Sequence, residues 1–236
     1  MKKCQLILLF TLIVGLAIAH AQNGQNPLKG DIRVHDPAMI KDGDTYYVYS
    51  TGMGIPFKTS KDRIHWKNTG RVFPADDIPA WFTKDIPEQK GDVWAPDIHY
   101  YKGKYYLYYA VSAWMNFHSS IGLATNATLN PNDPDYKWLD EGQIISYKNG
   151  GKGVNDIDPN VFVDRDGKVW LIYGSYKAGV RMTQLNPATG KLLNHDPKII
   201  KLTNGLGEGS FIIRGSEYYY LFVSRGRCCA GLKSTY

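Results

Sequence analysis

The chain has few cysteines and lacks the short motifs of several common enzyme classes. Its three cysteines are Cys4, Cys228 and Cys229, too few for the disulfide framework of a small secreted fold. No G-x-G-x-x-G follows a strand, and there is no Walker loop or H-E-x-x-H motif. The histidines show no metal-ligand spacing. We therefore expect no nucleotide-binding or zinc-protease function, and this sequence by itself requires no metal or cofactor.

Dense blocks of charge are also absent. Lysine and arginine total 28 against 22 acidic residues, a formal net charge of +6. Nucleic-acid-binding proteins usually gather such an excess into a basic patch or stripe, whereas here it is scattered along the chain. We expect no nucleic-acid partner.

One long hydrophobic run stands out, from Leu6 to Ile18. Lys2 and Lys3 precede it, and Ala19-His20-Ala21 follows with the small-x-small pattern of a signal-peptidase site. The run is too short for a comfortable membrane span, although a retained anchor is the alternative. The sequence predicts a signal peptide over residues 1–21, a secreted or periplasmic location and no stable membrane association. Removing two lysines lowers the net charge from +6 to +4.

A short pattern that opens with an acid occurs four times. The copies begin at Asp36, Asp97, Asp158 and Glu208, spaced by about 61, 61 and 50 residues. Each copy continues as a strand, a glycine-containing turn and an aromatic strand, which predicts a β-hairpin. Repeats of this length are typical of propellers, whose inner strands surround a central axis. The pattern predicts an all-β propeller in which the four acids share one position and form a ring of carboxylates.

The repeats divide the chain into blades. We expect the catalytic domain over residues 22–236, with blades at about 33–72, 95–145 and 156–200 and a fourth from about 208 that stops after two strands. A long loop should cover residues 73–94. We interpret the sequence as truncated, with a natural four-bladed or open array as the alternative. A monomer is expected, although the open strand edge predicts association with other chains.

Carboxylates brought together in a pocket suit glycosidic bond cleavage. One carboxyl group must donate a proton while another activates water or attacks the sugar. The alternative is that Asp36-Pro and Asp158-Pro are ordinary turn dipeptides. Loop aromatics, namely Trp81, Trp94, Trp114 and Phe117, would either stack on sugar rings or pack on the blades.

The adjacent cysteines Cys228 and Cys229 allow two interpretations. A disulfide between neighbours needs an unusual peptide geometry, and the other interpretation is a pair of reduced, partly buried thiols. The residues themselves leave both open.

Seven motifs, in order, resemble glycoside hydrolase family 43, and most of all its arabinan endo-1,5-α-L-arabinosidases. They are Val34-His-Asp-Pro, Val93-Trp-Ala-Pro-Asp-Ile, Ile121-Gly-Leu-Ala-Thr, Asp156-Ile-Asp-Pro-Asn-Val-Phe, Leu171-Ile-Tyr-Gly-Ser-Tyr, Glu208-Gly-Ser-Phe-Ile and Cys228-Cys-Ala-Gly-Leu-Lys-Ser-Thr-Tyr. The resemblance implies a five-bladed propeller, here with about four blades present and the last incomplete. It also implies an inverting hydrolase of arabinan, a side chain of pectin.

The resemblance assigns a role to each acid. Asp36 would be the general base, Glu208 the general acid, and Asp158 the residue that orients the acid and raises its pKa. Implied sugar contacts are Trp94, Asp97, Phe117, Asn155 and Ser175. Cys228 and Cys229 would lie near the cleft as a paired feature, which favours the disulfide. The resemblance also implies a calcium ion for a longer parent chain, held partly by a histidine late in that chain. That stretch is missing here, so this sequence by itself does not require the ion.

Three alternatives stay open for function. One is an exo-acting α-L-arabinofuranosidase or β-xylosidase of the same family. Another is a propeller that binds carbohydrate without cleaving it. An inactive fragment of a true enzyme is the third.

Overall fold

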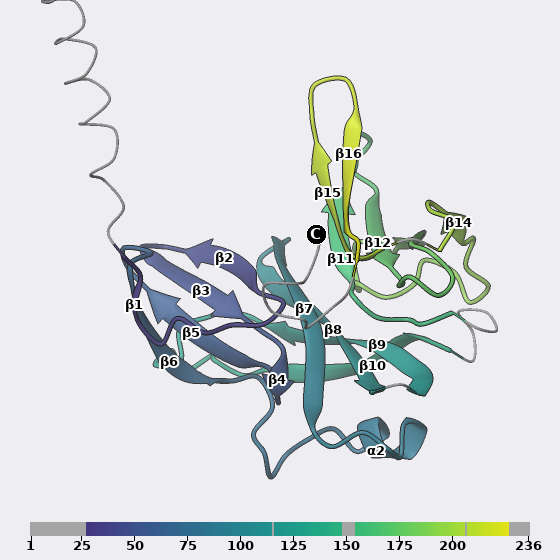
Figure 1. Ribbon diagram of the computed structural model, residues 1–236. Helices are drawn as coiled ribbons and strands as arrows, with labels where there is room; N and C mark the ends of the chain where they lie inside the picture. Colours follow the sequence, from purple (N-terminus) through teal and green to yellow (C-terminus); the bar gives the residue numbers. More distant parts are fainter. Residues whose placement is uncertain (1–26, 115, 148–153, 206, 227–236) are drawn as a thin grey trace, which may run out of the picture.

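The computed structural model describes residues 27–114, 116–147, 154–205 and 207–226, without the side chains of residues 116 and 117. The predicted signal peptide and the pair Cys228 and Cys229 lie outside the described residues. The described chain forms four β-sheets (Figure 1). This confirms the predicted all-β class. Within the described ranges, no helix is both long and apolar enough to cross a membrane.

The first sheet has the strand order β1-β6-β5-β3-β2. Its strands are β1 (Lys29–Gly30), β2 (Ala38–Asp42), β3 (Thr45–Tyr49), β5 (Pro56–Ser60) and β6 (His65–Arg71). The predicted hairpin is present, because Ala38 pairs with Tyr49 and Asp42 with Thr45 around a two-residue turn. Gly43 has a φ of 56° in that turn, a conformation that glycine adopts without steric cost.

The second sheet has the order β10-β9-β8-β7-β4. Its strands are β4 (Gly52–Met53), β7 (Asp92–Tyr101), β8 (Lys104–Ala113), β9 (Asn116–Asn126) and β10 (Leu139–Ser146). The segment predicted as a loop over residues 73–94 contains the short helix α2 (Trp81–Asp85) and the beginning of β7. Trp94 therefore lies on a strand and not on a loop.

The third and fourth sheets are smaller. The third has the order β11-β12-β13-β14 and the fourth is the pair β15-β16. Their strands are β11 (Asn160–Val163), β12 (Val169–Tyr173), β13 (Arg181–Leu185), β14 (Ile200–Lys201), β15 (Glu208–Arg214) and β16 (Tyr219–Ser224).

Strand β8 shows why this chain is rich in tyrosine. Side chains alternate between the two faces of a strand, and both faces of β8 are buried. Tyr105, Leu107 and Tyr109 belong to the core shared with the first sheet, whereas Tyr106 and Tyr108 belong to the core shared with the third. The second sheet is therefore packed between its two neighbours, as blades of a propeller are.

The inner strands β2, β7, β11 and β15 contact one another in that order. They bring the beginnings of the four sheets to a common region (Figure 1). The four described sheets do not close into a ring, so the five-bladed count stays a prediction.

A β-bulge recurs at the beginning of each inner strand. In the first sheet the carbonyl of His35 accepts a hydrogen bond of 2.9 Å from the N–H of Thr51, yet Ala38 pairs with Tyr49. Three residue steps on one strand thus oppose two on the other, which is the signature of a bulge. The equivalent steps run from Trp94–Ala110 to Asp97–Tyr108, from Ile157–Gly174 to Asn160–Ile172, and from Glu208–Ser224 to Phe211–Phe222.

The bulges give each sheet one residue with a positive φ. The φ angles are 48° at Asp36, 40° at Ala95, 55° at Asp158 and 57° at Gly209. Such angles are uncommon outside glycine and least costly for aspartate and asparagine. Non-glycine residues held there often mark functional sites.

This register corrects the predicted ring of four equivalent acids. Ala95, and not Asp97, occupies the position of Asp36 and Asp158, and Asp97 is equivalent to Asn160. Glu208 lies one residue before the equivalent position, which Gly209 fills. Only two of the four acids share a position, although three of them meet in space.

Candidate functional site

Asp36, Asp158 and Glu208 come together where the inner strands begin. The charges of Asp36 and Glu208 both raise the pKa of Asp158, and the charge of Asp36 raises the pKa of Glu208. Such mutual effects require short distances. The bulges that precede or begin β2, β11 and β15 thus collect the three acids that the resemblance names as catalytic. Their catalytic roles stay predictions.

Asp36 is held by two neighbours. Its Oδ2 accepts a hydrogen bond of 2.6 Å from Thr51 Oγ1 and lies 2.8 Å from His35 Nδ1. Thr51 Oγ1 in turn accepts the N–H of Ala95 at 2.8 Å, so one hydroxyl fixes both the carboxylate and the next inner strand. The Asp36 side chain is 39% exposed and can therefore reach a water molecule. Neither His35 nor Thr51 was predicted as a site residue from the sequence, where only the position of His35 next to Asp36 was a usable signal.

Asp158 is the carboxyl group most affected by its surroundings. Burial, the largest effect, raises its pKa to about 7; a hydrogen bond from the Gly209 N–H and the proximity of His35 lower it, while Glu208 and Asp36 raise it. The bond from Gly209 to Asp158 Oδ2 measures 2.8 Å and joins the third sheet to the fourth. Asp158 therefore lies where the third and fourth sheets meet, beside the other two acids.

Glu208 begins β15 and is partly buried. Burial is the main reason that its pKa is raised, and repulsion from Asp36 adds to it. A carboxyl group with a raised pKa keeps its proton closer to neutral pH. The site therefore holds one exposed carboxylate and two carboxyls biased toward the protonated form, the combination that proton donation to a leaving oxygen requires.

The predicted aromatic contacts divide into two groups. The ring of Trp94 lies 6.4 Å from that of Trp114, edge to face, and Trp114 is 71% exposed. Trp81, in contrast, packs its ring 4.6 Å from Phe82 and donates its Nε1–H to Asp140 Oδ2 at 3.1 Å. Trp81 is thus part of the packing. Phe117 lies on β9, but its side chain is outside the described part of the chain.

Asn155 and Ser175 are buried near the site segment. They are 8% and 1% exposed, and among the described residues Asn155 Oδ1 and Ser175 Oγ have no hydrogen-bond partner. The neighbouring Asp156 is fully buried, and neither of its carboxylate oxygens accepts a hydrogen bond from the described part of the chain. Unsatisfied buried polar atoms are rare and call for a ligand, a water molecule or a functional reason.

Asp97 uses its carboxylate within the fold. Its Oδ2 accepts hydrogen bonds from His99 Nε2 at 2.7 Å, from the Val161 N–H at 2.6 Å and from Asn160 Nδ2 at 3.2 Å. The prediction that Asp97 contacts a sugar is untested, but this oxygen is already occupied.

A metal site was expected only for a longer parent chain. Among the described residues, no group of three or more histidine, cysteine or acidic side chains is placed to hold an ion. The calcium expectation therefore stays untested.

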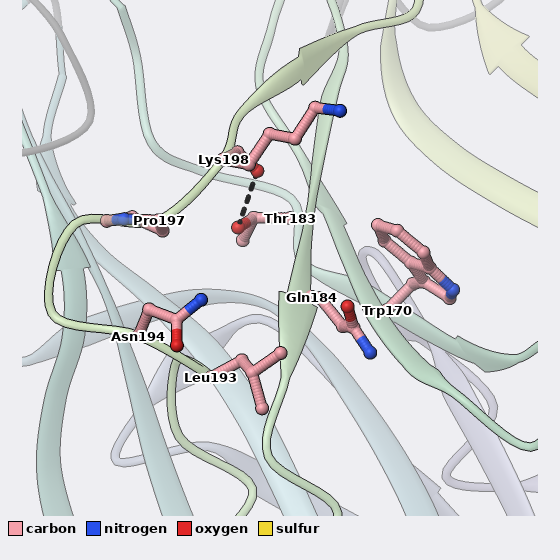
Figure 2. A pocket seen from close by; sticks show the side chains of 7 residues that line it. All are labelled: Trp170, Thr183, Gln184, Leu193, Asn194, Pro197 and Lys198. Carbon is pink, nitrogen blue, oxygen red and sulfur yellow. Dashed lines mark hydrogen bonds between the residues drawn. The ribbon is translucent and has the colours of Figure 1, made fainter.

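A separate hollow lies on the third sheet (Figure 2). It is lined by Trp170, Thr183, Gln184, Leu193, Asn194, Pro197 and Lys198. Thr183 Oγ1 donates to the Lys198 carbonyl at 3.1 Å (Figure 2). Trp170 pairs with Phe162, whose ring lies 5.7 Å from Tyr219. The hollow contains none of the predicted site residues.

Comparison with known proteins identifies what the chain resembles as a whole. The model of glycosyl hydrolases family 43 matches residues 25–236. An extracellular exo-α-(1→5)-L-arabinofuranosidase of Cellvibrio japonicus is 40% identical over 87% of this chain and 62% of its own length. An extracellular endo-α-(1→5)-L-arabinanase of Bacillus subtilis is 35% identical over 86% of this chain and 62% of its own. The chain thus spans about 62% of the length of these relatives.

A solved structure shows the same arrangement of strands. The α-L-arabinanase of Cellvibrio cellulosa, solved with arabinohexaose, superposes with a TM-score of 0.82 at 37% identity. The match covers 88% of this chain and 69% of that protein.

Proposed function

Because the chain belongs to glycosyl hydrolase family 43, we propose that it is a glycoside hydrolase that cleaves the α-1,5 bonds of arabinan with inversion. The observation that carries the proposal is the meeting of Asp36, Asp158 and Glu208, with the pKa values of Asp158 and Glu208 raised. Relatives that act on arabinan supply the substrate class.

Each acid has a role that its surroundings support. Asp36, exposed and oriented by Thr51 and His35, would take a proton from the attacking water. Glu208, with its raised pKa, would give its proton to the leaving sugar oxygen. The water attacks the anomeric carbon from the face opposite the leaving group, so the configuration inverts. The proton gained by Asp36 and the proton lost by Glu208 balance over one cycle through solvent.

Asp158 would support Glu208. Its own negative charge, when present, disfavours ionisation of Glu208, because like charges raise a neighbour's pKa. The bond from the Gly209 N–H to Asp158 Oδ2 ties Asp158 to the residue that follows Glu208. Asp158 thus both orients the acid and helps to keep it protonated.

Inversion makes a geometric demand. The carboxyl groups of Asp36 and Glu208 should lie roughly 6.5–9.5 Å apart, leaving room for the water. A separation near 5 Å in a crystal structure would instead indicate a retaining enzyme.

The sugar would be held by residues beside the three acids. Trp94, Asn155 and Ser175 are proposed sugar contacts. The ring of Trp94 packs against an exposed tryptophan ring, and the other two side chains carry unsatisfied polar atoms among the described residues. Phe117, Cys228 and Cys229 stay proposals from the resemblance. A five-bladed propeller is also proposed. Export from the cell is proposed from the predicted signal peptide over residues 1–21 and from relatives named as extracellular.

We propose endo action, with exo action as the second candidate. The Bacillus subtilis relative carries an endo name, and the Cellvibrio japonicus relative, at 40% identity, carries an exo name. The two actions differ in their products and not in the carboxylates.

Product analysis separates the two candidates. Purified residues 22–236, shown by circular dichroism to be folded, would be incubated with linear debranched arabinan beside the Glu208→Gln variant. A ladder of oligosaccharides from the parent alone supports endo cleavage, and arabinose alone supports exo cleavage. No product from folded parent chain would reject hydrolysis by this chain.

A further inference from the structure

A buried hydrogen-bond chain crosses three sheets just behind the proposed catalytic acids. It begins at Asp97 on β7, whose Oδ2 accepts from His99 Nε2 on the same strand and from the Val161 N–H on β11. The Asp97 side chain is only 12% exposed. The two bonds from β11, the Val161 N–H and Asn160 Nδ2, make Asp97 a link between the second and third sheets.

Asn160 continues the chain to the fourth sheet. Its Nδ2 donates to Asp97 Oδ2 at 3.2 Å, and its Oδ1 accepts the Ile212 N–H of β15 at 3.1 Å. The residue is 3% exposed. One amide group thereby joins β7, β11 and β15, which belong to three separate sheets and share no ladder hydrogen bonds.

The position of Asn160 relates it directly to the acids. Asp158 precedes it by two residues, in the bulge that leads into β11. Glu208 precedes Ile212 on β15 by four residues across the bulge. A second link runs parallel to the first, from the Gly209 N–H to Asp158 Oδ2 at 2.8 Å. Two side-chain-to-backbone bonds thus fix how β11 and β15 align.

We propose that Asn160, held by Asp97, is a positioning residue that sets the separation of the Asp158 and Glu208 carboxyl groups. The inference rests on the proposed function only in taking these two groups as part of the catalytic set. Removing the amide leaves the half-buried Ile212 N–H and part of the Asp97 carboxylate without their bonds. Such unsatisfied groups are costly, and the alignment of β15 on β11 then depends on the bond from Gly209 to Asp158 and on the contacts of Arg165 with the fourth sheet.

The first test measures the carboxyl groups without requiring activity. The side-chain carboxyl carbons of Asp158 and Glu208 would be titrated by NMR in the parent chain, in Asn160→Ala and in the isosteric Asp97→Asn. If β15 moves away from β11, Asp158 loses burial, the largest effect on its pKa, together with repulsion from Glu208, and these outweigh the loss of the pKa-lowering bond from Gly209. Its pKa should then fall by roughly one unit in Asn160→Ala, and by less in Asp97→Asn, which keeps an acceptor oxygen. Other charged groups near Asp158, namely Asp36 and His35, are unchanged in both variants.

Asn126 provides a matched control. It is 2% exposed, and its Oδ1 accepts the Lys137 N–H at 3.1 Å within the second sheet. Asn126→Ala should lower stability as a buried asparagine variant does, while leaving the pKa values of Asp158 and Glu208 at their parent values.

Kinetics on arabinan provide the second readout. We expect kcat of Asn160→Ala to fall roughly 10- to 100-fold with KM nearly unchanged, since misplaced catalytic groups cost mainly the chemical step. If both variants keep the parent pKa values while folded, or shift them no more than Asn126→Ala, the proposal is overturned. Should Asn160→Ala fail to fold, Asp97→Asn decides alone. An inactive parent would reject the proposed function, whereas the NMR titration would still decide the positioning role.

Discussion

At the scale of single residues, Glu208 differs from the other two acids because its role depends on a proton. Glu208→Gln keeps the shape of the side chain but cannot give up a proton, so we expect activity on arabinan to fall roughly 10²- to 10⁴-fold. Circular dichroism and the melting temperature should match the parent. Cleavage by the variant at a rate near the parent's would remove Glu208 from the role of acid.

The same proton predicts the direction of the pH profile. The pKa of Glu208 is raised, so the active, protonated form persists to higher pH than for an ordinary glutamate and is lost as the pH rises through that raised value. Activity of the parent should therefore decline on the alkaline side.

Asp156 is expected to weaken the fold at neutral pH. Burial, only partly offset by Arg181, raises its pKa to about 7, well above the value in an unfolded chain. The folded state therefore binds this proton more tightly, and the stabilisation present near pH 4 is lost as the pH rises through about 7.

Asp156→Asn tests this directly. The variant removes the charge, so its free energy of unfolding should exceed the parent's by about 2–4 kcal/mol near pH 8 and match it near pH 4. Urea denaturation at both pH values measures the difference. Asp166, whose side chain is 74% exposed, supplies the control variant Asp166→Asn. An equal gain at both pH values would show that the charge of Asp156 is not the cause.

At the scale of elements, the bulge on β7 carries a strained residue. Ala95 has a φ of 40°, and a left-handed conformation costs a residue with a Cβ roughly 1–2 kcal/mol. Ala95→Gly should relieve it, so we expect a net stabilisation of about 0.5–1 kcal/mol after the added flexibility of the unfolded chain. Ala124→Gly, at a fully buried position within β9, should destabilise instead. Thermal denaturation of the two variants measures the difference. An equal loss of stability in both would contradict the prediction.

Hairpins could be predicted from this sequence, whereas their alignment could not. Alternating aromatic residues and the Asp-Gly turn identify β2 and β3 because the period of a strand is visible in the chain. A bulge adds a residue without changing that local pattern, so Asp97 was placed in the position that Ala95 holds. Asn160 and Thr51 were not predicted either, because their hydrogen-bond partners lie on strands far away in sequence.

The three acids were nevertheless found together. Asp36 and Asp158 stand just before strands β2 and β11, and Glu208 begins β15, and such beginnings converge in a propeller-like arrangement. Their pKa shifts were beyond the sequence, since burial of Asp158 and the bond from Gly209 arise only from packing between sheets.

At the scale of the whole molecule, the fourth sheet presents apolar side chains to solvent. Phe211 and Phe222 pair across β15 and β16 and are 52% and 56% exposed. Exposed apolar patches and unpaired strand edges both favour association. We expect residues 22–236 to self-associate as their concentration rises, as measured by sedimentation velocity.

Phe222→Glu should reduce that association by placing a charge in the contact. Tyr100 is similarly exposed, at 58%, but lies on the second sheet, so Tyr100→Glu serves as the control. A parent chain that stays monomeric at high concentration would contradict this expectation, as would equal effects of the two substitutions.

The separation of the chain into sheets linked by few polar bonds has a mechanical consequence. Ladder hydrogen bonds run within each sheet, whereas neighbouring sheets are joined by apolar packing and by a few side-chain bonds such as Thr51 to Ala95, Asp97 to Val161 and Asp158 to Gly209. A chain pulled from its ends would therefore yield one sheet at a time. A sheet such as the third, from Asn160 to Lys201, would release roughly 14 nm of length. Force would therefore break the molecule in countable steps, and the proposed catalytic acids would part at the first step that separates their strands.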